Sequence, residues 1–353
     1  MFMEGSIDMN RLSRAVHIML CRHDIFRSRF EHTEAGAVQV VMSTPSPQDR
    51  LQVEPVVDRA AALESLRQLE HHKYDISVED TMKLVAFSWS PSHHILVLGY
   101  SRFVGDGQTT ENLFNEIGQL YAGVTLPPPV QQCPEFVTRQ RQDYESDIDC
   151  WVSLHKKTAA ELFVLDLPND QPRGSVTGGM REQHTVSVRL SPMIAIREKE
   201  RSRKHKASPL HLYLTAFHVL LARLAGTADV AVGVADTNRP SLQNVATMGY
   251  LANLLPLRMA YLAADTFGDE LVATKEHMRT ALQHSQVPYN ILLDRLGIAP
   301  PRPGVDAAAP LFQAVAARER TPYDSVLEIS DDPTKTPLIT FKLLSAMYSH
   351  LGA

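Results

Sequence analysis

The sequence is poor in cysteine and carries no large excess of charge. Three cysteines, Cys21, Cys133 and Cys150, stand among 353 residues without the spacing of a zinc site. A net charge of −5 gives no basic footprint for a polyanion, so we expect no nucleic-acid partner. No apolar run approaches the roughly 18 residues that span a bilayer. Nothing at the first residue resembles a signal peptide, so we expect a cytoplasmic protein without a membrane partner.

Metal-ligand patterns are also missing. Four of the 15 histidines form two adjacent pairs, at 71–72 and at 93–94. Neighbouring side chains on a helix or strand point in different directions, so neither pair can close around one ion. We therefore predict no metal site, and no motif in the sequence predicts a cofactor.

The chain is long enough for two lobes. Its 353 residues are 44% hydrophobic, which allows a sizeable buried core. A proline-rich stretch at 125–136, TLPPPVQQCPEF, is typical of a semi-rigid connector. We predict an N-terminal lobe over 1–135 and a C-terminal lobe over 136–353.

The segment from His93 to Gly123 is the most informative. Residues 95–100 form a short apolar run that predicts a buried strand. Two glycines then flank Asp106, and Thr109 or Thr110 can cap a helix that begins near Glu111. A strand, a tight turn and a capped helix place residues 101–106 where side chains can converge on a cavity.

This segment resembles the core motif of the condensation domains of nonribosomal peptide synthetases, which belong to the chloramphenicol acetyltransferase-like superfamily. The family pattern is His-His-x-x-x-Asp-Gly, and residues 101–107 read Ser-Arg-Phe-Val-Gly-Asp-Gly. Asp106 and Gly107 match, whereas Ser101 and Arg102 replace both histidines. In the family the second histidine assists attack of an amine on a thioester. A guanidinium stays protonated at any working pH, so Arg102 cannot act as a general base.

Ordered matches continue along almost the whole chain. They include CRHDIFRSRF at 21–30, ADTNRP at 235–240, GYLANLLPLR at 249–258 and HSQVPYNILLDRLGI at 284–298. Several are closest in wording to the condensation domains of fungal polyketide–peptide hybrid synthetases. The chain lacks segments that the family has at both ends, which predicts a shortened, free-standing relative. The simpler interpretation of Arg22, His23 and Arg27 is that they form structural pairs with other side chains.

The resemblance implies an α/β fold, of the α+β kind, with two chloramphenicol acetyltransferase-like lobes. Each lobe would hold a mixed sheet with flanking helices, and a tunnel would run between the lobes. In the family the motif Asp is architectural and binds an arginine of the other lobe. Arg239 is the best match for that partner, so Asp106, Gly107 and Arg239 are predicted to be structural.

Three functional classes compete. We favour a cyclase that folds a polyketide–amino acid product and closes its rings by a pericyclic, Diels–Alder-type step, because such a step needs no proton transfer. Arg102 would polarise a carbonyl, aided by Ser101. The alternatives are an amide- or ester-forming condensation enzyme or acyltransferase, and a non-catalytic docking module for a tailoring enzyme. A carrier protein or a synthetase is a further expected partner.

The predicted catalytic residues are thus Arg102 and Ser101. Arg102 has a competing structural interpretation, in which it fills the space of the lost histidine and pairs with a carboxylate such as Glu111. Tyr100 is a candidate substrate contact that could orient the same carbonyl group. Four further candidates follow from the segments that face the tunnel in the family; they are Phe103, Tyr250, Asn253 and Leu255.

Overall fold

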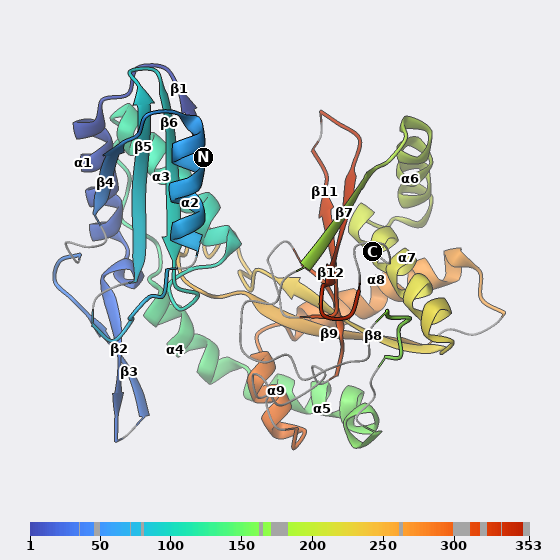
Figure 1. The fold of residues 1–353 in the computed structure, drawn as a ribbon. Helices are drawn as coiled ribbons and strands as arrows, with labels where there is room; N and C mark the ends of the chain where they lie inside the picture. The colour runs from blue at the N-terminus through green and yellow to red at the C-terminus, as the bar shows by residue number, and fades with distance from the viewer. Residues whose placement is uncertain are drawn as a thin grey trace. The chain divides into compact units, whose positions relative to one another are not determined.

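The computed structural model describes most of the chain. The described residues are 1–34, 36–45, 50–70, 72–78, 81–161, 165–170, 183–260, 264–298, 311–317, 323–332 and 334–348. They divide into two compact units (Figure 1), of which unit 1 comprises Met1–Arg139 and Arg239–Leu251, and unit 2 comprises Gln140–Asn238 and Ala252–Ala353.

Unit 1 is built on a four-stranded sheet in the order β1-β6-β5-β4. Only the β4–β5 pair is parallel; the other two pairs are antiparallel. The strands of unit 1, including a separate two-stranded hairpin, are β1 (Phe2–Glu4), β2 (Ser28–Thr33), β3 (Gly36–Val41), β4 (Leu51–Pro55), β5 (Met82–Ser90) and β6 (His93–Tyr100). Its helical elements are α1 (Met9–Arg22), the 3₁₀ turn η1 (Asp24–Arg27), α2 (Arg59–Glu70) and α3 (Gly107–Ala122). Helix α4 (Cys133–Asp143) contains the division between the units.

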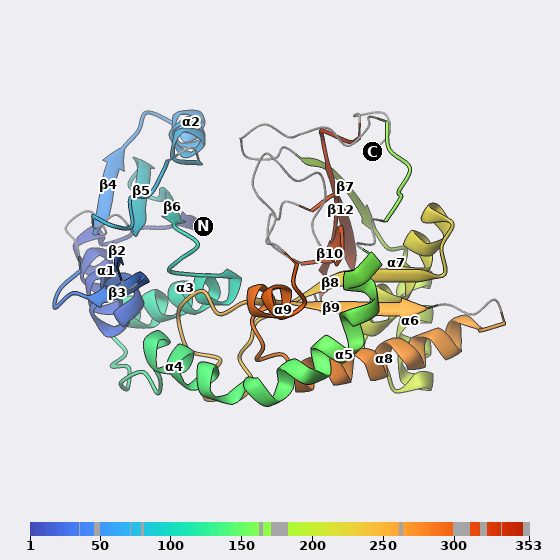
Figure 2. The ribbon, with the colours of Figure 1, turned by 90° about the horizontal axis from the view of Figure 1, so that it is seen from below.

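The sheet of unit 1 is covered on both faces (Figure 2). Strand alternation sends Leu84 and Leu96 to one face, where they pack with α1 and α3. The opposite face carries Val85 and Val97, which pack with Ala62 of α2. The end of β6 therefore leaves a buried sheet and enters the motif turn between two packed layers.

Unit 2 holds a six-stranded mixed sheet in the order β7-β12-β11-β10-β8-β9. Strand β10 pairs parallel with both neighbours, and the remaining pairs are antiparallel. The strands are β7 (Gln183–Arg189), β8 (Asp229–Asp236), β9 (Asn253–Ala260), β10 (Ala314–Ala316), β11 (Ser325–Ser330) and β12 (Leu338–Leu344). The helices are α5 (Glu145–Glu161), α6 (Pro192–His205), α7 (Pro209–Ala225), α8 (Phe267–Gln283) and α9 (Tyr289–Arg295).

The predicted lobe boundary differs from the observed division. Residues 239–251 were assigned to the C-terminal lobe, but they belong to unit 1. The physical reason is the hydrogen bonding of Arg239, described below, which ties this segment to α3. The first unit also extends to Arg139, four residues beyond the predicted end of the N-terminal lobe.

The predicted start of the motif helix is also wrong. Helix α3 begins at Gly107, not near Glu111, and its N-cap is Asp106 in place of Thr109 or Thr110. The Asp106 carboxylate accepts a hydrogen bond from the Thr109 backbone N–H, which satisfies one of the free donors of the first turn. Helix α7 shows the same kind of cap, because Ser208 accepts from the His211 N–H, and Gly226 follows its last residue.

Within the described residues, none of the helices has the length and apolar character needed to cross a membrane. The same part of the chain contains no group of three or more His, Cys, Asp or Glu side chains that could hold a metal ion.

Candidate functional site

The motif turn joins β6 to α3 in a few residues. The Ser101 backbone N–H still continues the sheet by donating to the Thr81 carbonyl at 2.9 Å. A turn then closes from the Ser101 carbonyl to the Val104 N–H at 3.0 Å. Val104 is fully buried, whereas Arg102 and Phe103 on the same turn are exposed. The Val104 side chain thus anchors the turn in the core, and Arg102 and Phe103 remain exposed to solvent.

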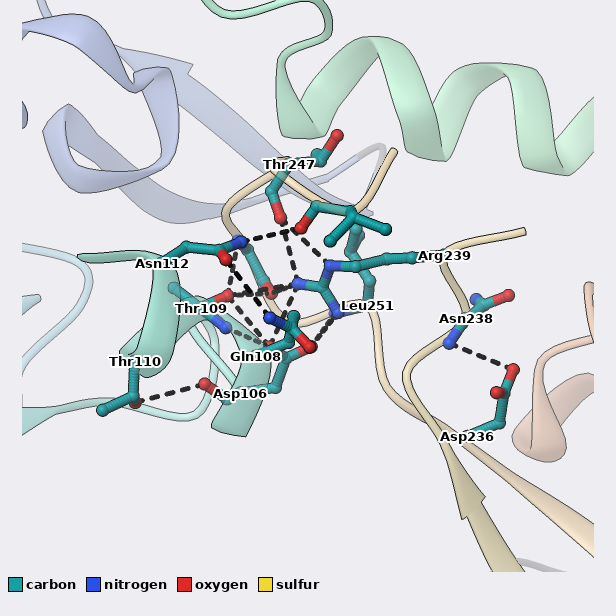
Figure 3. A network of polar contacts seen from close by, with 12 residues as sticks. Asp106, Gln108, Thr109, Thr110, Asn112, Asp236, Asn238, Arg239, Thr247 and Leu251 are labelled. Atoms are coloured by element: carbon teal, nitrogen blue, oxygen red, sulfur yellow. Dashed lines mark hydrogen bonds and ion pairs between the residues drawn. The ribbon is translucent and has the colours of Figure 1, made fainter. Parts of the chain in front are cut away.

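Asp106 lies at the buried end of the turn, where it is 2% exposed. Arg239 reaches it with two nitrogens, Nη1 to Oδ2 and Nη2 to Oδ1, each at 3.0 Å (Figure 3). The Asp106 carboxylate also accepts from the backbone N–H groups of Thr109 and Leu251, at 2.9 and 3.0 Å. A two-pronged, charge-assisted contact of this kind is the strongest way to hold a buried carboxylate.

The other donors of Arg239 bind the backbone of its own segment. Its Nε and Nη2 donate to the Thr247 carbonyl at 3.1 and 3.0 Å, and Nη2 also meets the Gly249 carbonyl at 3.3 Å. The Thr109 hydroxyl completes the link, because it donates to the Gly249 carbonyl and accepts from the Gly249 N–H. The pair expected between Asp106 and Arg239 is present, and both members lie in unit 1.

Gly249 fits this network for a conformational reason. Its φ of +148° lies in the region that side chains disfavour. A Cβ at this position would stand 2.5 Å from the Cys133 sulfur, far inside contact distance. Cys133 is itself buried, and burial raises the pKa of its thiol to about 11, so it is a packing residue at neutral pH.

The two predicted catalytic residues lie at the open end of the turn. Arg102 is exposed, and Ser101 is half-buried with its hydroxyl 3.5 Å from the Phe103 backbone nitrogen. Asp106 is occupied by Arg239 and the α3 cap, so its carboxylate serves the fold. The motif therefore separates into a structural half and an accessible half.

Three of the five predicted substrate contacts belong to unit 1. The Tyr100 hydroxyl donates to the Asp106 carbonyl at 3.2 Å and meets the Thr110 hydroxyl at 2.9 Å. Phe103 is 59% exposed, and its ring centroid lies 5.5 Å from that of Phe30. Tyr250, also in unit 1, is 44% exposed.

The remaining two predicted contacts belong to unit 2. The Asn253 amide donates to the Ser285 and Val287 carbonyls at 2.9 and 2.7 Å, and it accepts from the Tyr289 N–H at 3.0 Å. Leu255 is 1% exposed in the core that lies under β9. Both side chains are occupied by internal packing and hydrogen bonding, and their role as substrate contacts stays a prediction.

A second polar cluster joins α1 to α3. Glu116 Oε2 lies 3.2 Å from Arg22 Nε and 2.9 Å from His23 Nε2. Burial would raise the pKa of the Glu116 carboxyl, but the hydrogen bonds and charges of His23 and Arg22 outweigh it and lower the pKa. Arg27 pairs with Asp24. These contacts agree with the structural interpretation of the three basic residues.

A pocket of about 240 Å³ opens beside that cluster. It is lined by Arg22, Glu116 and the prolines at 127–129, and its lining includes none of residues 101–107. The pocket is thus separate from the motif turn. Arg22 holds the proline-rich segment against α1, because it donates to the Leu126 and Pro127 carbonyls.

Comparison with protein families settles the relationship. Residues 1–341 match the model of the condensation domain. The chain belongs to the condensation-domain family. A solved condensation domain, that of the monacolin K polyketide synthase MokA, superposes with a TM-score of 0.87 at 44% identity, covering 99% of this chain and 86% of the other. The mixed α/β fold with two chloramphenicol acetyltransferase-like lobes is therefore confirmed.

Two curated relatives show where such domains occur. The chain is 44% identical over 394 residues to the polyketide synthase component of compactin nonaketide synthase from Penicillium citrinum, and 30% identical over 375 residues to the hybrid synthetase ucsA from Acremonium sp. These alignments cover 99% and 98% of this condensation domain but 13% and 9% of the relatives, so it corresponds to a small part of each. The predicted relationship to fungal hybrid synthetases is confirmed, and identity is higher with the nonaketide synthase.

Sequence reasoning missed most of the network around Asp106. Thr109 was considered only as a cap, and nothing pointed to the carbonyls of Thr247 and Gly249 as acceptors for Arg239. The carbonyls lie 8 and 10 residues beyond Arg239 in an irregular segment, and this segment meets Thr109 across 140 residues of chain. No local pattern encodes such a contact.

Proposed function

We propose that this condensation domain folds a polyketide–amino acid product and closes its rings by a pericyclic, Diels–Alder-type step. The observation that carries the proposal is the residue pair at the exposed end of the turn. Ser101 and Arg102 stand where the family has two histidines, and Arg102 is exposed on the turn that follows β6. A permanently charged donor there favours polarisation of a carbonyl over transfer of a proton.

The chemistry of the step suits these groups. In the ring closure a diene and an alkene form two carbon–carbon bonds at the expense of two π bonds, and no proton enters or leaves. A guanidinium that donates to a carbonyl conjugated with the alkene makes the alkene more electron-poor and lowers the barrier. Holding the two ends of the chain in contact distance contributes further, because the reaction becomes one of orientation.

The nature of the relatives supports the substrate class. The relative from Penicillium citrinum is named as the polyketide synthase component of a nonaketide synthase, and ucsA is named as a hybrid synthetase. A polyketide chain, with or without an amino acid, is therefore the proposed guest. A carrier protein or synthetase is the proposed source of that chain.

A metabolite comparison tests the proposal. Deleting the part of the gene that encodes residues 1–353 should cause loss of one ring-closed isomer and accumulation of a linear precursor. Loss of an amide product would instead indicate condensation, and an unchanged carbon skeleton with reduced oxidation would indicate docking of an oxygenase. Either of these two results would overturn the cyclase assignment.

The accumulated linear precursor then serves as the substrate in solution. Arg102→Ala should slow ring closure by about 10²-fold, within the range found when one donor to a developing charge is removed. Arg14→Ala, an exposed arginine of α1, is the matched control and should keep the parental rate and isomer ratio. Full retention of rate and selectivity in Arg102→Ala would remove Arg102 from the mechanism.

A further inference from the structure

A polar cluster lies next to the motif turn, on the face of the unit 1 sheet that α2 covers. It surrounds Gly99, two residues before Ser101. Along β6 the residues of this face are Ile95, Val97 and Gly99, and Ser101 follows in the same alternation. Ile95 and Val97 are covered by α2, but Gly99 and Ser101 are half-buried. The apolar face therefore ends at Gly99, where the polar cluster begins.

The cluster is formed by Tyr74, His72 and Lys83. Lys83 on β5 is the direct cross-strand partner of Gly99. The Tyr74 hydroxyl occupies the space above Gly99, because a Cβ built on that glycine would lie 2.3 Å from the hydroxyl oxygen. Cross-strand side chains start only about 5 Å apart, so the Tyr74 hydroxyl and the Lys83 stem lie side by side on the sheet.

His72 connects the two. Its ring stands edge-on to the Tyr74 ring, with centroids 4.7 Å apart and planes at 89°. Its Nδ1 lies 3.4 Å from Lys83 Nζ. An ammonium can only donate hydrogen bonds, so Nδ1 is the acceptor and a neutral His72 ring carries its proton on Nε2.

The charge of Lys83 is the unusual feature. Lys83 is half-buried, and no carboxylate among the described residues forms an ion pair with it. Lys342, which is similarly half-buried, has Glu328 at 2.6 Å. A partly buried cation is stabilised when an anion arrives.

We propose that Lys83, with Tyr74 and His72 beside it, binds a carboxylate at the end of the substrate acyl chain. The proposal rests on the proposed function for the substrate class and adds the group by which the substrate is held. Lys83 supplies the charge, the Tyr74 hydroxyl lies next to it, and Ser101 follows Gly99 along the strand. The site would fix one end of the chain near the turn that carries Arg102.

A binding measurement without any reaction tests the inference. Calorimetry with the full chain compares octanoate with octanamide, which has the same tail and no charge. Octanoate should bind about tenfold more tightly. Lys83→Met should abolish that preference and Lys83→Arg should keep it, while Lys73→Met, which removes an exposed lysine nearby, should leave it unchanged. Equal binding of the two ligands by the parent, or a preference that survives Lys83→Met, would overturn the site.

Gly99→Ala probes the same site sterically. The added methyl group would displace the Tyr74 hydroxyl, so the preference for octanoate should fall several-fold. Tyr74→Phe, which removes the hydroxyl without filling space, should weaken octanoate binding in the same direction. If both variants bind octanoate as the parent does, Tyr74 has no part in the site. Because no ring is closed in these assays, their failure is distinguishable from failure of the cyclase assignment.

Discussion

The two ends of the motif turn show opposite uses of charged side chains. At one end Asp106 is 2% exposed and is held by Arg239, Thr109 and Leu251. At the other end Arg102 is exposed, one residue after the last pairing of β6 with its neighbour. The buried charge of Asp106 stabilises the fold, and the exposed charge of Arg102 can act on a substrate. The architecture of the family motif is thus kept in this chain, and the exchange of its chemistry is the part that we propose.

The largest expected effect comes from breaking the enclosed end. Asp106→Ala should lower the free energy of unfolding by about 3–5 kcal/mol, because it leaves the Arg239 guanidinium buried without its counter-charge. Urea unfolding measures this. Asp8→Ala is the matched control: Asp8 also caps a helix through its carboxylate, but it is exposed, so its loss should cost about 1 kcal/mol. Equal losses in the two variants would contradict the role given to Arg239.

A buried histidine in unit 2 sharpens the comparison, because no carboxylate among the described residues forms an ion pair with it. Burial, with a smaller contribution from the charge of Arg258, lowers the pKa of His155 to about 4. Its ring lies 5.7 Å from that of Trp151. The unfolded chain takes up the proton near pH 6.5 and the folded chain only near 4, so stability should fall as the pH drops through this window.

The loss at His155 should reach about 3 kcal/mol at pH 4 relative to pH 7. Urea unfolding followed by tryptophan fluorescence at both pH values measures it. His155→Gln keeps a polar side chain that does not titrate, so its stability should decline less over the same pH window. A decline as steep as that of the parent would assign the acid sensitivity to other groups.

Substitution of Gly249 tests how strictly the segment 239–251 requires its backbone conformation and close packing. Gly249→Ala should cost about 2 kcal/mol, from a disfavoured φ and a clash with the Cys133 sulfur. Cys133→Ala in the same chain should recover part of that loss by removing the sulfur. Gly118→Ala, at a helical glycine of α3 with open space around its Cβ position, should be neutral or slightly stabilising. Thermal unfolding ranks the variants.

The smallest expected effect on stability is at the accessible end. Arg102→Ala should change the free energy of unfolding by less than about 0.5 kcal/mol, as surface substitutions commonly do. A loss comparable to that of Asp106→Ala, measured in the same urea titration, would favour the structural interpretation of Arg102 over the proposed role in ring closure.

The sequence predicted the strand, the turn and the helix of the motif because these depend on local patterns. The apolar run before Ser101 and the spacing of Leu113 and Ile117 are sufficient for that. It did not predict where α3 begins, since an Asp and two threonines can each cap a helix. Asp106 is the N-cap of α3 because Arg239 fixes the position of the same carboxylate.

The predicted site shows the same limit. The Asp106–Arg239 pair was expected from the family resemblance as a contact between two lobes, but both residues lie in unit 1. The reason is that Asp106 and Thr109 bind the segment of Arg239 at several points. The position of Tyr74 over Gly99 could not be read from the sequence either. A glycine in a strand indicates a close approach, but it does not name the residue that approaches.

The return of residues 239–251 to unit 1 has a consequence for synthesis of the protein. When a ribosome has released the chain as far as Arg139, the residues of the sheet and helices around Asp106 have been made but Arg239 has not. The Asp106 carboxylate should therefore stay hydrated until residue 251 has left the ribosome. Unit 1 should therefore mature after much of unit 2 has been translated, and a fragment that stops at Arg139 should not hold its native form.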